Sequence, residues 1–287
     1  MDKAARGMLS GFAGMLIFSG SLPATRIAVM GFDPLFLTSA RALIAALVGL
    51  GPMIWMRQPH PARADLAPLL IVALGTVVGF PLFTALALQH VSSAHSLVFI
   101  GLLPLSTAVF AVVRGGERPH AAFWLFAGLG SALVIGYAGL GGMTVSPIGD
   151  AFMLAAILVC GLGYAEGGRL SRRMGGWQVI SWALVLAAPA MALLALLTLP
   201  ASFSSIGAPA WGGLAYVSVF SMLIGFALWY RGLALGGIAA VGQLQLFQPF
   251  FGLSLAALLL REAVSASMIL VTLGVVACVA AARRFAR

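Results

Sequence analysis

The chain has 287 residues, of which 62% are hydrophobic and only 8% are charged, with a mean hydropathy of +1.09. A water-soluble protein of this size cannot cover its surface with so few charges, so the composition excludes an ordinary soluble domain. The formal net charge of +9 would be compatible with a nucleic-acid partner, so the distribution of the basic residues has to be considered.

Ten apolar runs follow one another along the chain, each long enough to cross about 30 Å of hydrocarbon as an α-helix. They are numbered here as spans 1 to 10 and cover residues 8–29, 34–55, 66–88, 92–113, 120–140, 148–168, 177–199, 209–230, 238–260 and 264–282. Polar and apolar residues do not alternate within them, which favours helices over strands. The sequence therefore predicts an all-α integral membrane protein with ten transmembrane helices.

The basic residues gather on one side of these spans. If the connections are assigned alternately from a cytoplasmic N-terminus, 13 of the 16 Lys and Arg residues fall on the cytoplasmic side. Only Arg26, Arg41 and Arg261 fall on or near the outer side. Cytoplasmic loops of membrane proteins carry such an excess. Both termini are therefore predicted to be cytoplasmic, and the charge implies no nucleic-acid partner.

Span 1 is interrupted by Ser19-Gly20-Ser21 and by Pro23. Proline lacks a backbone donor and clashes with the preceding turn of a helix, so a kink or a break is predicted here. The hydroxyl groups of Ser19 and Ser21 either bond carbonyl groups freed by the break or contact a ligand.

Span 2 carries a charge inside the bilayer. Arg41 lies seven residues beyond Pro34, or about 10 Å along a helix. A charge at that depth is costly unless it is paired or faces water. Arg41 therefore either lines the outer part of a polar cavity or pairs with Asp33 or with carbonyl groups of a neighbouring helix.

Spans 3 and 4 hold the next candidates. Pro81, in the aromatic-flanked segment 79–83, predicts another helix break, with Phe83 beside it. His95 and Phe99 are placed on one face of span 4 by their spacing of four residues. Since histidine titrates near physiological pH, His95 either couples protons or binds substrate, or it is a satisfied structural histidine near the outer mouth.

Span 9 repeats part of the residue pattern of span 4. Pro104 is followed after thirteen residues by Glu117, and Pro249 is followed after thirteen residues by Glu262. Both landmarks are displaced by 145 residues, about half of the chain. Either this is chance within a biased composition, or the chain is an internally duplicated transporter with two proline-broken helices beside a central site.

The halves are expected to meet in the glycine-rich segment 139–149. We place the boundary between residues 1–143 and residues 144–287, with five spans in each half. Because five is an odd number, the second half would enter the membrane from the opposite side.

Spans 6 and 8 carry further polar and aromatic residues. Glu166 and Arg169 are three residues apart and form either an interfacial ion pair or, through the glutamate, a gating or coupling group. Tyr164 is a candidate for substrate contact. Trp229 and Tyr230, at the end of span 8, are expected in the aromatic belt at the membrane surface.

Span 9 contains three glutamines, Gln243, Gln245 and Gln248, just before Pro249. Primary amides inside a membrane are costly unless they form hydrogen bonds. Gln245 and Gln248 are predicted to share a face, and Gln243 to point elsewhere. Their partners are either neighbouring helices or a polar ligand in a central cavity.

The combination of Asp33-Pro34 with Arg41 and of the two runs 102–117 and 247–262 resembles the drug/metabolite transporter superfamily, in its EamA-type ten-helix branch. The likeness covers nearly the whole chain and is greatest to bacterial aromatic amino acid exporters. It implies an inverted-repeat bundle in a bacterial inner membrane, a central cavity, alternating access, and structural roles for the two glutamates. The chain departs from the family at Phe18-Ser19-Gly20, where Trp-Gly is frequent.

The sequence has no phosphate-binding Gly-Lys-Ser/Thr loop, so transport driven by nucleotide hydrolysis in this chain is not expected. The main hypothesis is a secondary exporter of small amphipathic metabolites, including aromatic amino acids, with no cofactor, no metal site and no catalytic residue. Alternatives are an exporter of other metabolites or drugs, a channel-like or non-transporting subunit, and an intramembrane enzyme. The expected substrate contacts are Ser19, Ser21, Phe83, His95, Phe99, Tyr164, Gln243, Gln245 and Gln248, and the expected helix-breaking or gating positions are Pro23, Pro81, Pro104 and Pro249.

Overall fold

The computed structural model describes residues 2–115, 120–139, 146–261 and 264–285, and all of its regular elements are helices. Within these residues, seven helical stretches are long and apolar enough to cross a membrane. They are Lys3–Val29, Pro34–Trp55, Arg63–His90, Ser93–Arg114, Pro147–Met174, Gly176–Leu197 and Ala208–Gly236, with shorter apolar helices at Ala121–Gly130, Leu244–Leu260 and Ala266–Ala282. An all-helical membrane fold is thus confirmed, whereas the count of ten spans stays a prediction.

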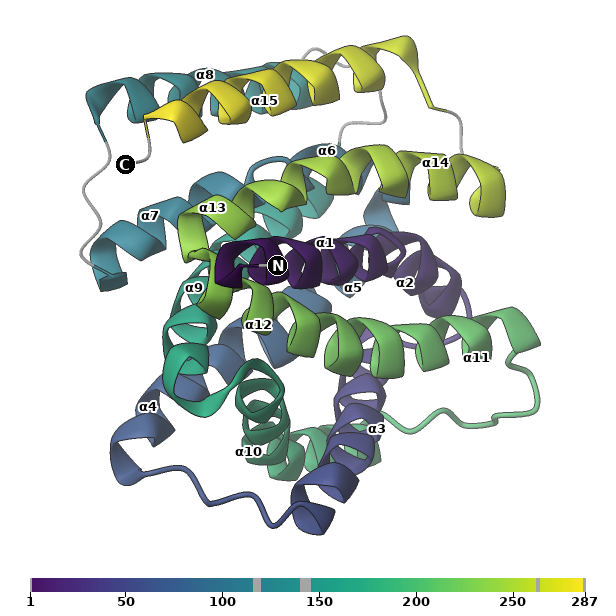
Figure 1. Ribbon diagram of the computed structural model, residues 1–287. Helices are drawn as coiled ribbons and strands as arrows, with labels where there is room; N and C mark the ends of the chain where they lie inside the picture. Colours follow the sequence, from purple (N-terminus) through teal and green to yellow (C-terminus); the bar gives the residue numbers. More distant parts are fainter. Residues whose placement is uncertain (1, 116–119, 140–145, 262–263, 286–287) are drawn as a thin grey trace.

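Several stretches are divided into shorter elements (Figure 1). The first part of the chain forms α1 Lys3–Ser19, α2 Ser21–Val29, α3 Pro34–Trp55, α4 Arg63–Val72, the π-helix η1 Ala73–Gly79, α5 Phe80–His90, α6 Ser93–Ile100, α7 Leu103–Gly115 and α8 Ala121–Gly139. The second part forms α9 Pro147–Met174, α10 Gly176–Leu197, α11 Ala208–Ala215, the π-helix η2 Tyr216–Gly225, α12 Phe226–Gly236, α13 Ile238–Gly242, the 3₁₀-helix η3 Gln243–Phe247, α14 Gln248–Leu260 and α15 Ala266–Arg284.

The four prolines singled out in the sequence all lie in the first turn of an element. Pro23 is the third residue of α2, and Pro81, Pro104 and Pro249 are the second residues of α5, α7 and α14. At a true helix start, a first-turn residue has no intrahelical acceptor for its N–H, so proline loses no backbone hydrogen bond there. An element boundary lies beside each of Pro23, Pro104 and Pro249, although at Pro249 the 3₁₀-helix η3 runs directly into α14.

The interruption expected at Pro81 takes another form. The chain stays helical, and the π-helix η1 precedes the proline, with the N–H of Phe80 donating to the carbonyl oxygen of Gly75 five residues earlier. A π-turn widens the helix by one residue and so absorbs the mismatch that the proline creates. The sequence signal located the irregularity but not its type.

The irregular elements recur along the chain. Displaced by 145 residues, the separation of Pro104 and Pro249, η1 falls within η2. The same displacement carries the break between α6 and α7, at residues 101–102, onto the end of η3.

Glycines bring α1 and α12 into backbone contact, and the two helices lie side by side in Figure 1. A Cβ atom added to Gly232 would lie 2.7 Å from the Cα atom of Gly11, and one added to Gly7 would lie 2.5 Å from the backbone nitrogen of Gly236. Small residues permit this approach, on which helix association within a membrane largely depends. We call this contact the α1–α12 seam.

Other pairs complete the bundle. Helix α3 packs on α10, and α8 packs on α15 as a pair at one edge of the molecule (Figure 1). Helix α9 contacts α4, α5, α7, α10 and α12, and is therefore the helix around which the interior is arranged.

The α1–α12 seam generates a stability prediction. We expect Gly232→Ala to lower the unfolding temperature of the detergent-solubilised protein, because the added methyl group overpacks the seam at a cost of about 1–3 kcal/mol. The matched control is Gly51→Ala in α3, where a Cβ atom meets nothing within 4 Å. Alanine gains about 0.5–1 kcal/mol over glycine within a helix, so the control should be neutral or stabilising. Equal shifts for both variants would contradict the close backbone contact.

Candidate functional site

The interior contains a cluster of aromatic rings contributed by α1, α9 and α12. Ring centroids lie 6.1 Å apart for Phe18 and Trp229, 5.5 Å for Tyr164 and Trp229, and 4.9 Å for Phe18 and Phe226. All four side chains are at most 5% exposed. Such rings present flat apolar faces and, through tyrosine and tryptophan, polar edges.

The expectation that Trp229 and Tyr230 belong to a surface belt is wrong, since both are fully buried. Helix α12 continues beyond them to Gly236, so these residues do not end their helix. In the sequence, the charge of Arg231 interrupts the apolar run, whereas the helix continues past it.

Two of the span 9 amides reach this cluster from η3 and the start of α14. The amide nitrogen of Gln245 donates to the Tyr164 hydroxyl at 3.2 Å, and that of Gln248 donates to the Phe18 carbonyl at 3.3 Å. Both residues are at most 3% exposed. Their predicted common face is consistent with these contacts, while the side chain of Gln243 lies outside the described part of the chain.

Three polar atoms around these rings have no hydrogen-bond partner among the described residues. They are the carbonyl oxygens of Gln245 and Gln248 and the indole nitrogen of Trp229. Buried polar atoms almost always have a partner, and leaving one without a partner is costly. The unsatisfied set, two acceptors and one donor, therefore marks a place for a polar ligand or water. We call Phe18, Tyr164, Trp229, Gln245 and Gln248 the polar–aromatic cluster.

The predicted serines beside the break in span 1 bond the protein. The Ser19 hydroxyl donates to the Met15 carbonyl at 3.0 Å, and the hydroxyl groups of Ser21 and Ser221 are 2.7 Å apart. The Tyr216 hydroxyl donates to the Ile17 carbonyl at 2.7 Å, so this backbone oxygen near the break has a side-chain hydrogen bond. Ser19 thus bonds a carbonyl group, as the structural alternative expects, whereas Ser21 bonds a side chain of η2; a ligand contact at either serine stays a prediction.

His95 is paired with a residue that the sequence analysis did not single out. Its Nε2 lies 2.6 Å from a carboxylate oxygen of Asp150, in the first turn of α9. The two side chains are 2% and 14% exposed. The predicted neighbourhood of His95 and Phe99 is confirmed, with ring centroids 5.3 Å apart. Phe83 stacks instead on Phe152 of α9, at 6.3 Å.

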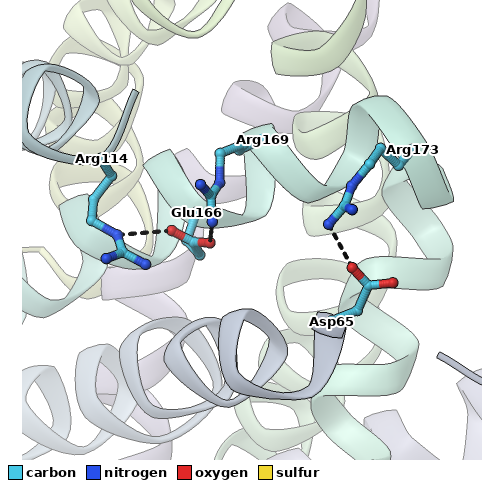
Figure 2. A network of polar contacts seen from close by, with 5 residues as sticks. All are labelled: Asp65, Arg114, Glu166, Arg169 and Arg173. Atoms are coloured by element: carbon cyan, nitrogen blue, oxygen red, sulfur yellow. Dashed lines mark hydrogen bonds and ion pairs between the residues drawn. The ribbon is translucent and has the colours of Figure 1, made fainter. Parts of the chain in front are cut away.

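The other end of α9 carries a second charged contact, shown in Figure 2. The carboxylate of Glu166 is fully buried and accepts from Nε of Arg114 at 3.2 Å and from a terminal nitrogen of Arg169. The predicted pair with Arg169 is confirmed. Arg114, from α7, was missed because a contact between spans leaves no local signal in the sequence.

A third contact joins α9 to α4, where Arg173 donates to Asp65 (Figure 2). Taken with Asp150 and Glu166, it ties α9 to the first part of the chain at both ends. A buried carboxylate is stable only when such partners neutralise it.

Arg41 does not pair with Asp33 in the structure. The Asp33 carboxylate instead caps α3, accepting from the backbone N–H groups of Leu35 at 2.8 Å and Phe36 at 3.3 Å. Arg41 is 3% exposed, and its Nε has no partner among the described residues. Glu117 and Glu262, the echoed glutamates, lie outside the described residues.

Comparisons with known proteins agree on one class. The model of the EamA-like transporter family matches residues 5–138 and 147–283. The chain is similar to the uncharacterized transporter YdeK of Bacillus subtilis. The two are 63% identical over 287 residues, and the match covers 100% of each chain. An uncharacterized transporter of Synechocystis is 22% identical over 278 residues, covering 91% of this chain and 84% of the relative.

A protein of known crystal structure has a similar fold. The TM-score is 0.72 at 21% identity, with 96% of this chain and 97% of the other covered.

The Glu166 contact generates a double-mutant prediction. We expect Glu166→Gln and Arg114→Gln each to lower the free energy of unfolding, and the double variant to lose less than the sum. The coupling should be about 1–2 kcal/mol, because the carboxylate is buried but the Arg114 side chain is 40% exposed and partly screened by solvent. Urea titration in detergent, followed by tryptophan fluorescence, measures it. Additive losses would show that the pair is energetically silent.

Proposed function

Because this chain belongs to the EamA-like transporter family, we propose that it is a secondary transporter that exports small amphipathic metabolites, aromatic amino acids among them, by alternating access. The observation that carries the substrate class is the polar–aromatic cluster with its three unsatisfied polar atoms. Its rings and its polar edges are both fully enclosed by the bundle.

The cluster offers complementary chemistry for a zwitterion. An ammonium group carries only donors and suits the carbonyl oxygens of Gln245 and Gln248. A carboxylate carries only acceptors and suits the indole N–H of Trp229. The rings of Phe18 and Tyr164 suit a flat apolar side chain through stacked or edge contacts.

Access to this cluster requires movement of the helices, since its members are at most 5% exposed. Alternating access supplies that movement, with the cluster opened first to one side and then to the other. The charged contacts at the two ends of α9 are suited to hold one side closed while the other is open: His95 with Asp150 at one end, and Glu166 with Arg114 at the other.

We also propose that the halves 1–143 and 144–287 are inverted repeats of five spans each. Support comes from the family model, which matches one segment in each half, and from the recurrence of irregular elements at a displacement of 145 residues. The packing supports it too. In the two halves, α1 corresponds to α9, α5 to α12, α3 to α10 and α8 to α15. The contact of α1 with α12 therefore has its equivalent in the contact of α9 with α5, and α3 with α10 and α8 with α15 are contacts between equivalent helices.

The substrate proposal predicts flux in proteoliposomes. We expect phenylalanine or tryptophan trapped inside to drive saturable counterflow of labelled amino acid. Trp229→Phe keeps a ring but removes the donor, so flux at low substrate should fall about tenfold, the effect of losing one hydrogen bond to a charged group. The control Trp211→Phe makes the same change at a ring that is 42% exposed and outside the cluster.

Two outcomes would count against the proposal. If no amino acid supports counterflow, the substrate class fails, and flux without counterflow would favour a channel. If Trp229→Phe and Trp211→Phe behave alike, the cluster is not the binding site.

The inverted repeat predicts the sidedness of two equivalent loops. Pro59 and Ser204, exposed and 145 residues apart, should lie on opposite faces of the membrane. In a chain with Cys160 and Cys278 replaced by alanine, Ser204→Cys should react with an impermeant maleimide on intact cells, and Pro59→Cys only after permeabilisation. Labelling of both from one side would refute the inverted arrangement while leaving the substrate proposal intact.

A further inference from the structure

A cavity of about 530 Å³ opens at the end of the bundle where α1 begins and α9 ends. Its wall comes from four helices that are distant in the sequence. The charged and polar members of the wall are Lys3 and Arg6 of α1, Ser171 of α9 and Arg231 of α12. The residues that line it include three cations and no carboxylate.

These three cations line one cavity, and they differ from the three arginines that bond carboxylates at this end of the bundle. Arg114, Arg169 and Arg173 are each paired with a carboxylate of the protein. Among the described residues, Lys3, Arg6 and Arg231 have no such ion pair.

The nearest acid in the sequence, Asp2, is already engaged. Its carboxylate caps α1 by accepting from the backbone N–H of Ala5 at 2.6 Å. Asp2 still supplies one negative charge, but it does not line the cavity and is outnumbered by the three cations, so further counter-charge is expected from outside the protein.

The backbone adds further donors. Helix α10 begins at the cavity with Gly175 and Gly176, and no side chain caps its first turn. The first N–H groups of a helix lack intrahelical acceptors and carry a partial positive charge, which favours anions. A Cβ atom on Gly176 would lie 2.4 Å from the backbone nitrogen of Arg231, so the start of α10 packs on the backbone of α12 at a residue that lines the same cavity.

We propose that this cavity binds the phosphate group of an anionic phospholipid headgroup. Phosphate carries several strong acceptors, which suits three cations and a helix start together. A lipid is the natural source, because α1 continues from Lys3 and Arg6 into exposed apolar side chains: Leu9 is 60% exposed and Phe12 is 37% exposed. Basic pockets between transmembrane helices bind lipid headgroups in this way.

The site is separate from the polar–aromatic cluster and does not rest on the proposed transport. Native mass spectrometry of the protein in detergent tests it directly by titrating phosphatidylglycerol, phosphatidylcholine with the same acyl chains, and soluble glycerol phosphate. The variant is the triple substitution Lys3→Gln, Arg6→Gln and Arg231→Gln. The matched control removes three exposed basic residues that do not line the cavity, by Arg57→Gln, Arg63→Gln and Arg172→Gln.

We expect the protein to retain phosphatidylglycerol in preference to phosphatidylcholine. The cavity variant should bind it about 100-fold more weakly, at about 1 kcal/mol for each cation, and the control variant should keep the affinity within severalfold. Unfolding temperatures of both variants verify folding. Competition by glycerol phosphate would support the phosphate site but assign it to a soluble ligand. Equal retention of both lipids, or equal weakening in both variants, would overturn the proposal.

Discussion

Inside hydrocarbon, every backbone N–H and carbonyl group must find its hydrogen bond within the protein, and this constraint shapes each irregular element of the chain. The prolines stand in first turns, where no donor is missed. The π-helix η1 accommodates Pro81 without opening the helix. Near the break after α1, the hydroxyl group of Tyr216, which comes from η2, donates to the Ile17 carbonyl of α1. The irregular segments are therefore held by specific partners.

The same constraint makes the unsatisfied atoms of the polar–aromatic cluster informative. Within the bundle, Ser19, Ser21 and Glu166 have hydrogen-bond or ion-pair partners, whereas Trp229, Gln245 and Gln248 each have one polar atom without a partner among the described residues. The charges of α9 lie towards its ends and pair with the first part of the chain. The polar–aromatic cluster itself contains no charged side chain, which suits a substrate that brings its own charges.

The sequence predicted the helical class, the bounds of α3 and the positions of three element boundaries. These features depend on the length of an apolar run and on the position of a proline, both of which can be read locally. The glutamines were recognised because three amides in an apolar run are conspicuous. Contacts between spans could not be read in this way. The pairing of His95 with Asp150, the second arginine on Glu166 and the burial of Trp229 all depend on which helices become neighbours.

The α1–α12 seam limits how the molecule can change shape. Helices whose backbones touch have no layer of side chains between them that could be rearranged as they slide. We therefore expect α1 and α12 to move as one rigid unit, although they come from different halves of the chain. Any rocking of the bundle is then expected to take place at its side-chain interfaces, with these two segments moving together.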